Sequence, residues 1–186
     1  MTPIEILTQA MHWGMAAVYG WHAFGAMLAF RPAWGRFRFL SMGPAISYWV
    51  VYMRSLKVEL VPLGGVMGLL LLAVSLGLYE WARWSIRGKF FSYAMSDDTP
   101  RFVHSGGPFA YIRNPFYLSY WIGLIAALMA FPDPVIAGTV VVMFFYYQQV
   151  ARFEERKFAR SAVAEQYEAY KARTGRLFPK SSYSQH

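Results

Sequence analysis

Cysteine is absent from this chain of 186 residues, which excludes a disulfide framework, a thiolate metal site and a cysteine nucleophile. Charge is scarce: 15% of the residues are charged and 56% are hydrophobic, and no polar stretch is long enough for a separate soluble domain. The sequence therefore predicts a single membrane domain over 1–186. Residues 1–10 lack the Lys and Arg with which a secretory signal peptide opens, so we expect the first hydrophobic segment to be retained.

Acidic residues are fewer than basic ones, with 10 Asp and Glu against 18 Lys and Arg. This balance could indicate nucleic-acid binding, but no basic module with interleaved aromatic residues is present. In so apolar a chain, a basic excess is more typical of loops on the cytoplasmic side of a membrane. The sequence predicts contact with membrane lipids and no nucleic-acid partner.

Five hydrophobic runs are candidate transmembrane helices, because a bilayer core about 30 Å thick needs roughly 20 apolar residues. They are residues 7–30, 39–53, 60–79, 116–131 and 135–150. Only Pro132-Asp133-Pro134 separates the last two, which predicts an antiparallel hairpin over 115–151. The second run is short and contains Gly43-Pro44, so a re-entrant segment is the alternative there.

The positions of Lys and Arg predict the orientation of these runs. If the N-terminus is outside, the inside segments hold Arg31, Arg36, Arg38, Arg83, Arg87, Lys89, Arg101, Arg113 and eight residues from Arg152 to Lys180. Only Arg54 and Lys57 then lie outside. We expect an all-α integral membrane protein of five transmembrane helices in the cytoplasmic membrane, with its N-terminus outside and its C-terminus in the cytoplasm. A re-entrant second segment would reverse the first helix alone.

Two segments outside the runs are candidates for a site at the cytoplasmic surface. The loop 80–114 contains Gly106-Gly107-Pro108, and loops of this length in compact domains are usually functional. In the C-terminal tail, the spacing of apolar residues predicts an amphipathic helix over 152–173 that lies on the membrane or folds over the loop. Its apolar positions are Phe153, Phe158, Val163, Tyr167 and Tyr170.

Folding the hairpin brings opposite charges to one depth. Arg113 lies 20 residues before Asp133, and Glu154 lies 21 after it, so at about 1.5 Å per residue both reach the cytoplasmic boundary. Glu154 and Glu155 diverge by about 100° on a helix, so only one of them can point fully toward Arg113. The alternatives are a membrane-anchoring role for Arg113 and solvated positions for both carboxylates.

Residues 107–117 read Gly-Pro-Phe-Ala-Tyr-Ile-Arg-Asn-Pro-Phe-Tyr, in which Asn114 and Pro115 are a typical helix cap and first helical residue. This segment resembles the signature of the integral membrane methyltransferases typified by isoprenylcysteine carboxyl methyltransferase and related to phospholipid methyltransferases. There, Gly-Pro-Tyr is followed by Arg-His-Pro-x-Tyr. The resemblance continues through Pro134, the Glu154-Glu155 pair, Tyr167-x-x-Tyr170 and Pro179, and it identifies 88–180 as a methyltransferase-like core. The three N-terminal spans, 1–87, match only as hydrophobic helices.

Three departures from that signature concern the site. Asn114 stands in place of the usual His, and Phe109 in place of the usual Tyr. Glu155 precedes Tyr167 by twelve residues where the family usually shows eleven. Either Glu155 is therefore the first member of the family's pair, or a local irregularity restores the register.

The resemblance implies a cytoplasm-facing pocket for S-adenosylmethionine, built from the loop before the fourth span and closed by the tail helix. It implies methyl transfer to a lipophilic acceptor, such as an isoprenylcysteine-type carboxylate, a phospholipid amine or a thiol. Arg113 would orient an anionic acceptor or the cofactor carboxylate, Glu154 or Glu155 would hold the cofactor's ammonium or ribose hydroxyls, and Tyr111 with the loop backbone would enclose the adenine. The implied cofactor-binding residues are Val103, His104, Gly107, Pro108, Phe109, Tyr111, Arg113, Asn114, Pro115, Tyr117, Glu155 and Tyr167, with no metal.

Two other functions fit parts of the sequence. Membrane sterol reductases resemble this family in their C-terminal half and use NADPH, although they have a longer multi-span architecture. A non-enzymatic scaffold or a small transporter is the other alternative. His12 and His22 lie about 80° apart around the first helix, too far for a metal pair, so interhelical hydrogen bonds are expected.

Overall fold

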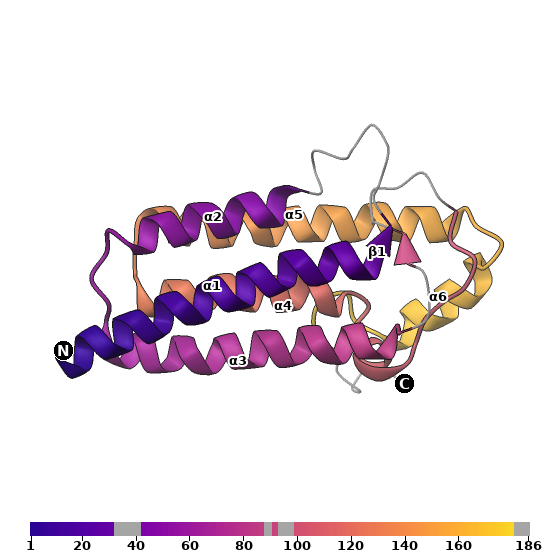
Figure 1. Cartoon of the computed structure of the whole chain (residues 1–186). Helices are drawn as coiled ribbons and strands as arrows, with labels where there is room; N and C mark the ends of the chain where they lie inside the picture. The colour runs from indigo at the N-terminus through magenta and orange to yellow at the C-terminus, as the bar shows by residue number, and fades with distance from the viewer. Residues whose placement is uncertain (32–41, 88–90, 93–98, 181–186) are drawn as a thin grey trace.

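The chain is helical, as predicted, in every long element that the structure describes (Figure 1). The computed structural model describes residues 1–31, 42–87, 91–92 and 99–180. Its α-helices are α1 (Pro3–Ala29), α2 (Gly43–Ser55), α3 (Pro62–Ser85), α4 (Pro115–Ala130), α5 (Pro134–Ala159) and α6 (Ala164–Arg173), with a 3₁₀ turn, η2, at Gly107–Ala110. Two-residue strands, β1 (Phe30–Arg31) and β2 (Phe91–Ser92), pair in parallel.

Local chemistry sets where several helices begin. A capping box precedes α1: the Glu5 carboxylate accepts from the Thr2 backbone N–H at 2.8 Å, and the Thr2 hydroxyl accepts from the Glu5 N–H at 3.2 Å. At the start of α5, Asp133 accepts from the backbone N–H groups of Val135 (2.9 Å) and Ile136 (3.3 Å). The Pro-Asp-Pro turn therefore ends one helix and caps the next, which gives the antiparallel hairpin.

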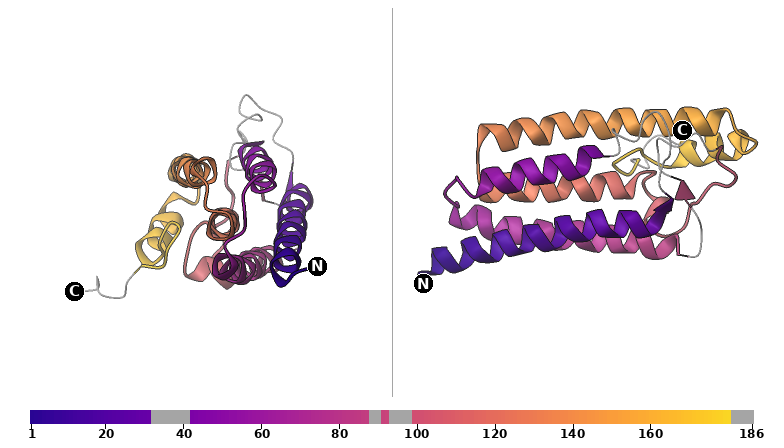
Figure 2. Two further views of the ribbon diagram at one scale, coloured as in Figure 1. Left: turned by 90° about the vertical axis from the view of Figure 1, so that its left-hand side faces the viewer. Right: turned by 45° about the horizontal axis from the view of Figure 1, so that its top comes forward.

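Helices α1 to α5 run alternately in opposite directions along the bundle, and α4 lies at its centre in the end-on view (Figure 2). The packing of α3 on α4 is especially close. A Cβ at Gly64 would overlap the carbonyl oxygen of Met129, and one at Gly68 would lie 2.7 Å from the carbonyl oxygen of Ala126. Small residues four apart thus let the two backbones approach, as in membrane helix pairs.

Two helices, α3 and α5, are long and apolar enough to cross a membrane, which is fewer than the five spans predicted. Helix α2 has 13 residues, or about 20 Å, against a hydrocarbon core of about 30 Å. Helix α4 has 16 residues and is apolar but short. Helix α1 has sufficient length at 27 residues, but polar residues such as His12 and His22 lower its hydropathy.

The tail differs from the single helix predicted over 152–173. Helix α5 continues nine residues beyond the predicted span and ends at Ala159, and α6 starts only at Ala164. Between them the chain turns, since the N–H of Ser161 donates to the carbonyl of Phe158 and the N–H of Ala164 to the carbonyl of Ser161. This turn is a local irregularity between Glu155 and Tyr167, which is one of the two explanations that we considered for their spacing.

The two ends of the bundle differ in what surrounds them. Helix α6, the segment 107–114, β1 and β2 gather at one end, which we call the α6 end, while the N-terminus and the Pro-Asp-Pro turn lie at the other (Figure 1). Of the residues assigned to the inside, Arg36, Arg38 and Lys89 lie outside the described residues.

Candidate functional site

At the α6 end, the hairpin register produces the predicted meeting of Arg113 with a carboxylate. Arg113 lies two residues before α4, and Glu155 lies in the last turns of α5. The Arg113 Nη2 donates to Glu155 Oε1 at 2.9 Å, with side chains only 7% and 11% exposed. Of the two adjacent glutamates, Glu155 is therefore the one that faces Arg113.

A second arginine shares the same carboxylate. The Nε of Arg176 donates to Glu155 Oε1 and its Nη2 to Oε2, both at 2.8 Å. These hydrogen bonds raise the pKa of Arg176 above its ordinary value. We call Arg113, Glu155 and Arg176 the ion-pair cluster; it carries two positive charges against one negative and so favours an added anion.

The guanidinium of Arg113 also caps the C-terminus of α6. It donates to the backbone carbonyls of Thr174 and of Lys171, the latter at 3.4 Å. The last carbonyls of a helix have no intrahelical donor and carry partial negative charge, so a cation there is stabilising. Arg113 thus joins the start of α4, the end of α5 and the end of α6.

Backbone pairing fixes the segment after α6 against the segment before α4. The N–H of Arg113 donates to the carbonyl of Gly175 at 2.8 Å, and the N–H of Asn114 to that of Arg176 at 3.1 Å. The Asn114 side-chain amide donates to the same Arg176 carbonyl at 3.1 Å. Asn114 occupies the N-cap position, but the prediction that its side chain caps α4 is wrong, because its side-chain oxygen accepts no hydrogen bond from the first turn of the helix.

Glu154 points in a different direction from Glu155. Its Oε1 accepts a hydrogen bond from the Tyr117 hydroxyl at 3.2 Å, and no other hydrogen bond reaches it from the part of the chain that the structure describes. The Tyr117 ring in turn stacks on Tyr147, with centroids 5.5 Å apart. The site therefore contains one carboxylate held by two cations and one held by a neutral phenol.

Aromatic side chains dock α6 on the rest of the site. The rings of Phe158 and Tyr167 stack with centroids 4.2 Å apart, so the turn after α5 folds α6 back on the helix. The Tyr170 hydroxyl donates to the carbonyl of Phe109 at 2.7 Å. Burial raises the pKa of the Tyr170 phenol to about 12, and it also raises that of Tyr167. The tail thus packs on the loop, one of the two positions expected for it.

The remaining predicted residues of the loop are placed around Phe109. Gly107 has φ of +59°, and a Cβ there would lie 2.7 Å from the Cβ of Ser85, so glycine is required for α3 and the loop to touch. His104 packs edge-on against Phe109 with centroids 5.1 Å apart. Pro108, Phe109 and Pro115 are buried and Val103 is half-buried. Tyr111 is 60% exposed, and its ring lies 6.3 Å from that of Trp81, away from the ion-pair cluster.

Deeper in the bundle, each of the five long helices contributes one polar aromatic residue to a layer that we call the polar layer: His22, Tyr48, Tyr79, Tyr120 and Tyr147. Tyr147 precedes Glu154 by seven residues in α5, so the polar layer lies about 10 Å farther from the α6 end than the carboxylates do. The Nδ1 of His22 and the Tyr48 hydroxyl are 2.8 Å apart, an interhelical hydrogen bond of the predicted kind. The Nε2 of His22 and the hydroxyl of Tyr147 are buried with no partner among the described residues, which is costly unless a bound molecule supplies one.

The sequence of the chain matches the phospholipid methyltransferase family over residues 63–165, more than half of its length. The chain belongs to this family. The predicted relationship to membrane methyltransferases is thereby confirmed. The family match includes α3, which the resemblance in the sequence did not cover, and it ends at the start of α6, before Tyr167, Tyr170 and Arg176. A search of curated proteins finds no match.

Sequence reasoning missed Arg176. It lies in a segment without helical periodicity, so no spacing rule connects it with Glu155, 21 residues earlier. The available signal was Thr174-Gly175-Arg176, a turn followed by a basic residue. A Cβ at Gly175 would overlap the carbonyl oxygen of Phe178, so this glycine allows the chain to fold back on itself.

Proposed function

We propose that this member of the phospholipid methyltransferase family transfers the methyl group of S-adenosylmethionine to a lipophilic acceptor, at a site on the α6 end of the bundle. The observation that carries the proposal is the ion-pair cluster with Glu154 beside it. It brings together the three residues that the sequence predicted to be catalytic, Arg113, Glu154 and Glu155, and adds Arg176. The family is one of membrane-associated methyltransferases, which supports the reaction class.

The side chains at the α6 end fit the charged and aromatic parts of S-adenosylmethionine. The surplus cation of the ion-pair cluster suits its carboxylate, and Glu154, which accepts only from Tyr117 among the described residues, suits its ammonium. The stacked rings of Phe158 and Tyr167 suit the adenine. In this proposal the exposed side chain of Tyr111 would have to turn away from Trp81 to reach the adenine.

When bound, S-adenosylmethionine supplies an electrophilic methyl carbon: the bond from the acceptor forms as the methyl–sulfur bond breaks, and the electron pair stays on sulfur. The protein's share of such a reaction is alignment and exclusion of water. Arg113 supports alignment because it connects α4, α5 and α6 at one point. Tyr170 supports exclusion of water because it fastens α6 over the loop carbonyl of Phe109.

The acceptor is proposed to reach the site from the lipid side. Its reacting atom would lie between Glu154 and the polar layer, where the His22 Nε2 and the Tyr147 hydroxyl could pair with a polar head group. An amine, a carboxylate or a thiol could use these two atoms, so they support a small polar head on an apolar molecule.

We further propose that all five long helices lie in the membrane, with the α6 end in the cytoplasm and the N-terminus outside. Large apolar side chains face outward on helices that did not qualify as spans: Trp13 of α1 is 74% exposed and Trp49 of α2 is 65% exposed. They are two of the many large apolar side chains that the described part of the chain exposes on its helices, which suits a surface in contact with lipid. The helix bounds put basic residues at the α6 end, which the cytoplasmic side favours: Arg83 and Arg87 at and just after the end of α3, Arg113 before α4 and Arg176 after α6.

One titration tests the proposal: S-adenosylhomocysteine, the demethylated product, against NADPH, on the purified chain in detergent. The expected result is saturable binding of S-adenosylhomocysteine and none of NADPH. Binding of NADPH would indicate a reductase, and binding of neither would indicate a protein without a nucleotide cofactor. Incubating a lipid extract with radiolabelled S-adenosylmethionine and separating the products would then identify the acceptor.

A further inference from the structure

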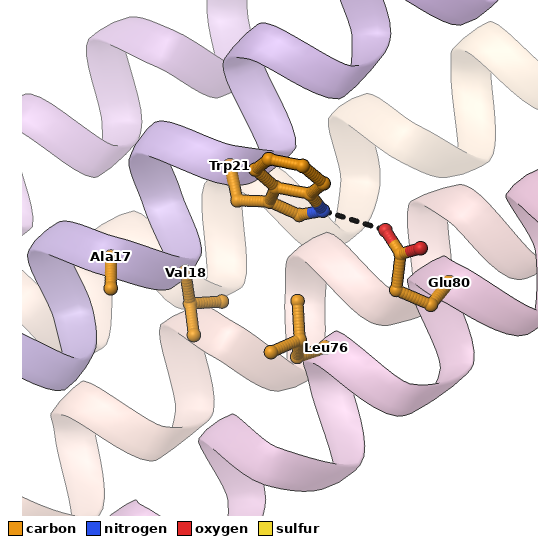
Figure 3. A pocket seen from close by; sticks show the side chains of 5 residues that line it. All are labelled: Ala17, Val18, Trp21, Leu76 and Glu80. Carbon is orange, nitrogen blue, oxygen red and sulfur yellow. Dashed lines mark hydrogen bonds between the residues drawn. The ribbon is translucent and has the colours of Figure 1, made fainter.

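A groove between α1 and α3 opens on the outer surface of the bundle, apart from the ion-pair cluster (Figure 3). It has a volume of about 360 Å³ and is lined by Ala17, Val18, Trp21, Leu76 and Glu80. All its walls are apolar except at Glu80, which lies toward the α6 end. The adjacent Trp81 instead faces the loop, where it meets Tyr111, so the groove and the proposed methyl-transfer site use different faces of α3.

The carboxylate at the polar end of the groove is already saturated. Glu80 accepts from the indole N–H of Trp21 at 2.6 Å, from that of Trp84 at 3.1 Å, and from the Nη2 of Arg83 at 2.6 Å. The Nε of Arg83 donates to both of its oxygens as well. Little capacity remains for a cationic ligand, so the role of Glu80 is to hold two indoles and a guanidinium in place.

What remains available at this end is positive charge. No described residue accepts a hydrogen bond from the Nη1 of Arg83. The guanidinium of Arg87 lies 5.2 Å from the centre of the Trp84 ring, at the surface. Glu80 offsets one of these two charges, which leaves an excess of about one positive charge beside an apolar groove. Guanidinium groups with free donors are well suited to a phosphate.

We propose that this groove is a phospholipid site, in which one acyl chain lies against Ala17, Val18 and Leu76 while the phosphate contacts Arg83 and Arg87. An apolar channel that ends in indoles and arginines has the chemistry of a lipid at the membrane interface. The lipid bound there is not the methyl acceptor. It braces the last turns of α3, on which Gly107 rests, so the inference goes beyond the proposed function.

Retention of lipid by the full chain in detergent, counted by native mass spectrometry, tests the proposal. The probe is palmitoyl-oleoyl phosphatidylglycerol, compared with the diacylglycerol that has the same chains and no phosphate. The expected result is one retained phosphatidylglycerol molecule, at least about fivefold less retention of diacylglycerol, and no displacement by inorganic phosphate. Equal retention of the two lipids would overturn the proposal, and so would displacement by inorganic phosphate alone.

Two matched substitutions locate the site. Ala17→Phe fills the groove and is expected to lower phosphatidylglycerol retention at least about fivefold, whereas Ala16→Phe, on the exposed neighbouring position, leaves it unchanged. Ala17→Leu is a smaller change, to be used if the Phe variant does not fold, and Arg87→Gln should weaken retention about threefold. Equal retention by the Ala16 and Ala17 variants would refute the assignment of the lipid to the groove. Binding of S-adenosylhomocysteine, measured on the same samples, reports separately on the proposed function.

Discussion

The two ends of α5 each carry a carboxylate paired with arginine, but the pairs differ in what else they hold. Asp133 caps the start of its own helix and pairs with Arg54 at 2.8 Å, and the arginine is 40% exposed. Glu155, at the other end, holds two largely buried arginines that come from other segments. The first pair connects the hairpin turn to the end of α2 alone. The second joins three segments and leaves a surplus cation, which is what separates a structural junction from a candidate binding site.

The largest expected effect is at the ion-pair cluster. Glu155→Ala leaves two arginines without their carboxylate, which should cost about 3–5 kcal/mol of unfolding free energy. Arg113→Ala leaves Glu155 paired with Arg176 and should cost less, about 1–3 kcal/mol. Each should also weaken S-adenosylhomocysteine binding more than about tenfold, measured by calorimetry. The matched control is Glu168→Ala, which breaks an exposed pair with Lys171 and should cost less than about 1 kcal/mol. If both site variants bind within about threefold of wild type, the site assignment is wrong.

A smaller and purely structural effect is expected at the opposite end. Asp133→Ala removes the cap of α5 and the partner of Arg54, and should cost about 1–2 kcal/mol in a thermal unfolding assay. S-adenosylhomocysteine affinity should remain within about threefold of wild type, because this turn lies at the opposite end of the bundle from α6 (Figure 1). Asp133→Asn, which can still cap, should recover most of the loss. A tenfold loss of affinity in the Ala variant would mean that the two ends are not independent.

The features that the sequence predicted are those joined by a regular helix, and the features that it did not predict depend on non-helical segments. The hairpin, the depth of Arg113 and its partnership with a glutamate follow from counting residues on either side of Asp133, because helical rise is nearly constant. The end of α5 and the start of α6 could not be located, because the polar turn 160–163 keeps a nearly helical spacing of apolar residues. The role of Arg176 depends on where a non-helical segment returns, which a periodic pattern does not encode. By contrast, the spacing of Gly64 and Gly68, four residues apart, is a pattern from which the close packing of α3 against another helix could have been predicted.

The tail provides the next effect in size. Tyr170→Phe removes the hydrogen bond to the Phe109 carbonyl and should cost about 1 kcal/mol. Its signature should be faster hydrogen exchange in 109–114 and in α6. In the wild type, saturating S-adenosylhomocysteine should slow exchange in residues 155–170 as well as in the loop, in detergent without anionic lipid. Protection confined to the loop would contradict the proposal that α6 covers the site and excludes water from it.

The smallest effect is expected midway along α5. Tyr147→Phe removes a buried hydroxyl that lacks a partner among the described residues, so the stability of the ligand-free protein should stay the same or rise by up to about 1 kcal/mol. Tyr48→Phe is the control, because it takes away the partner of His22 Nδ1 and should cost about 1–3 kcal/mol. Destabilisation of the Tyr147 variant by more than that control would show that the hydroxyl has a structural partner.

The close contact of α3 with α4 has a mechanical consequence. The backbone of α3 at Gly64 and Gly68 presses on the carbonyls of Met129 and Ala126, and the Ser75 hydroxyl donates to the Ser119 carbonyl at 2.7 Å. Because glycines and short side chains form this contact, the backbones of α3 and α4 have little room to separate. We therefore expect a molecule that arrives from the bilayer to enter the bundle at another helix contact than this one.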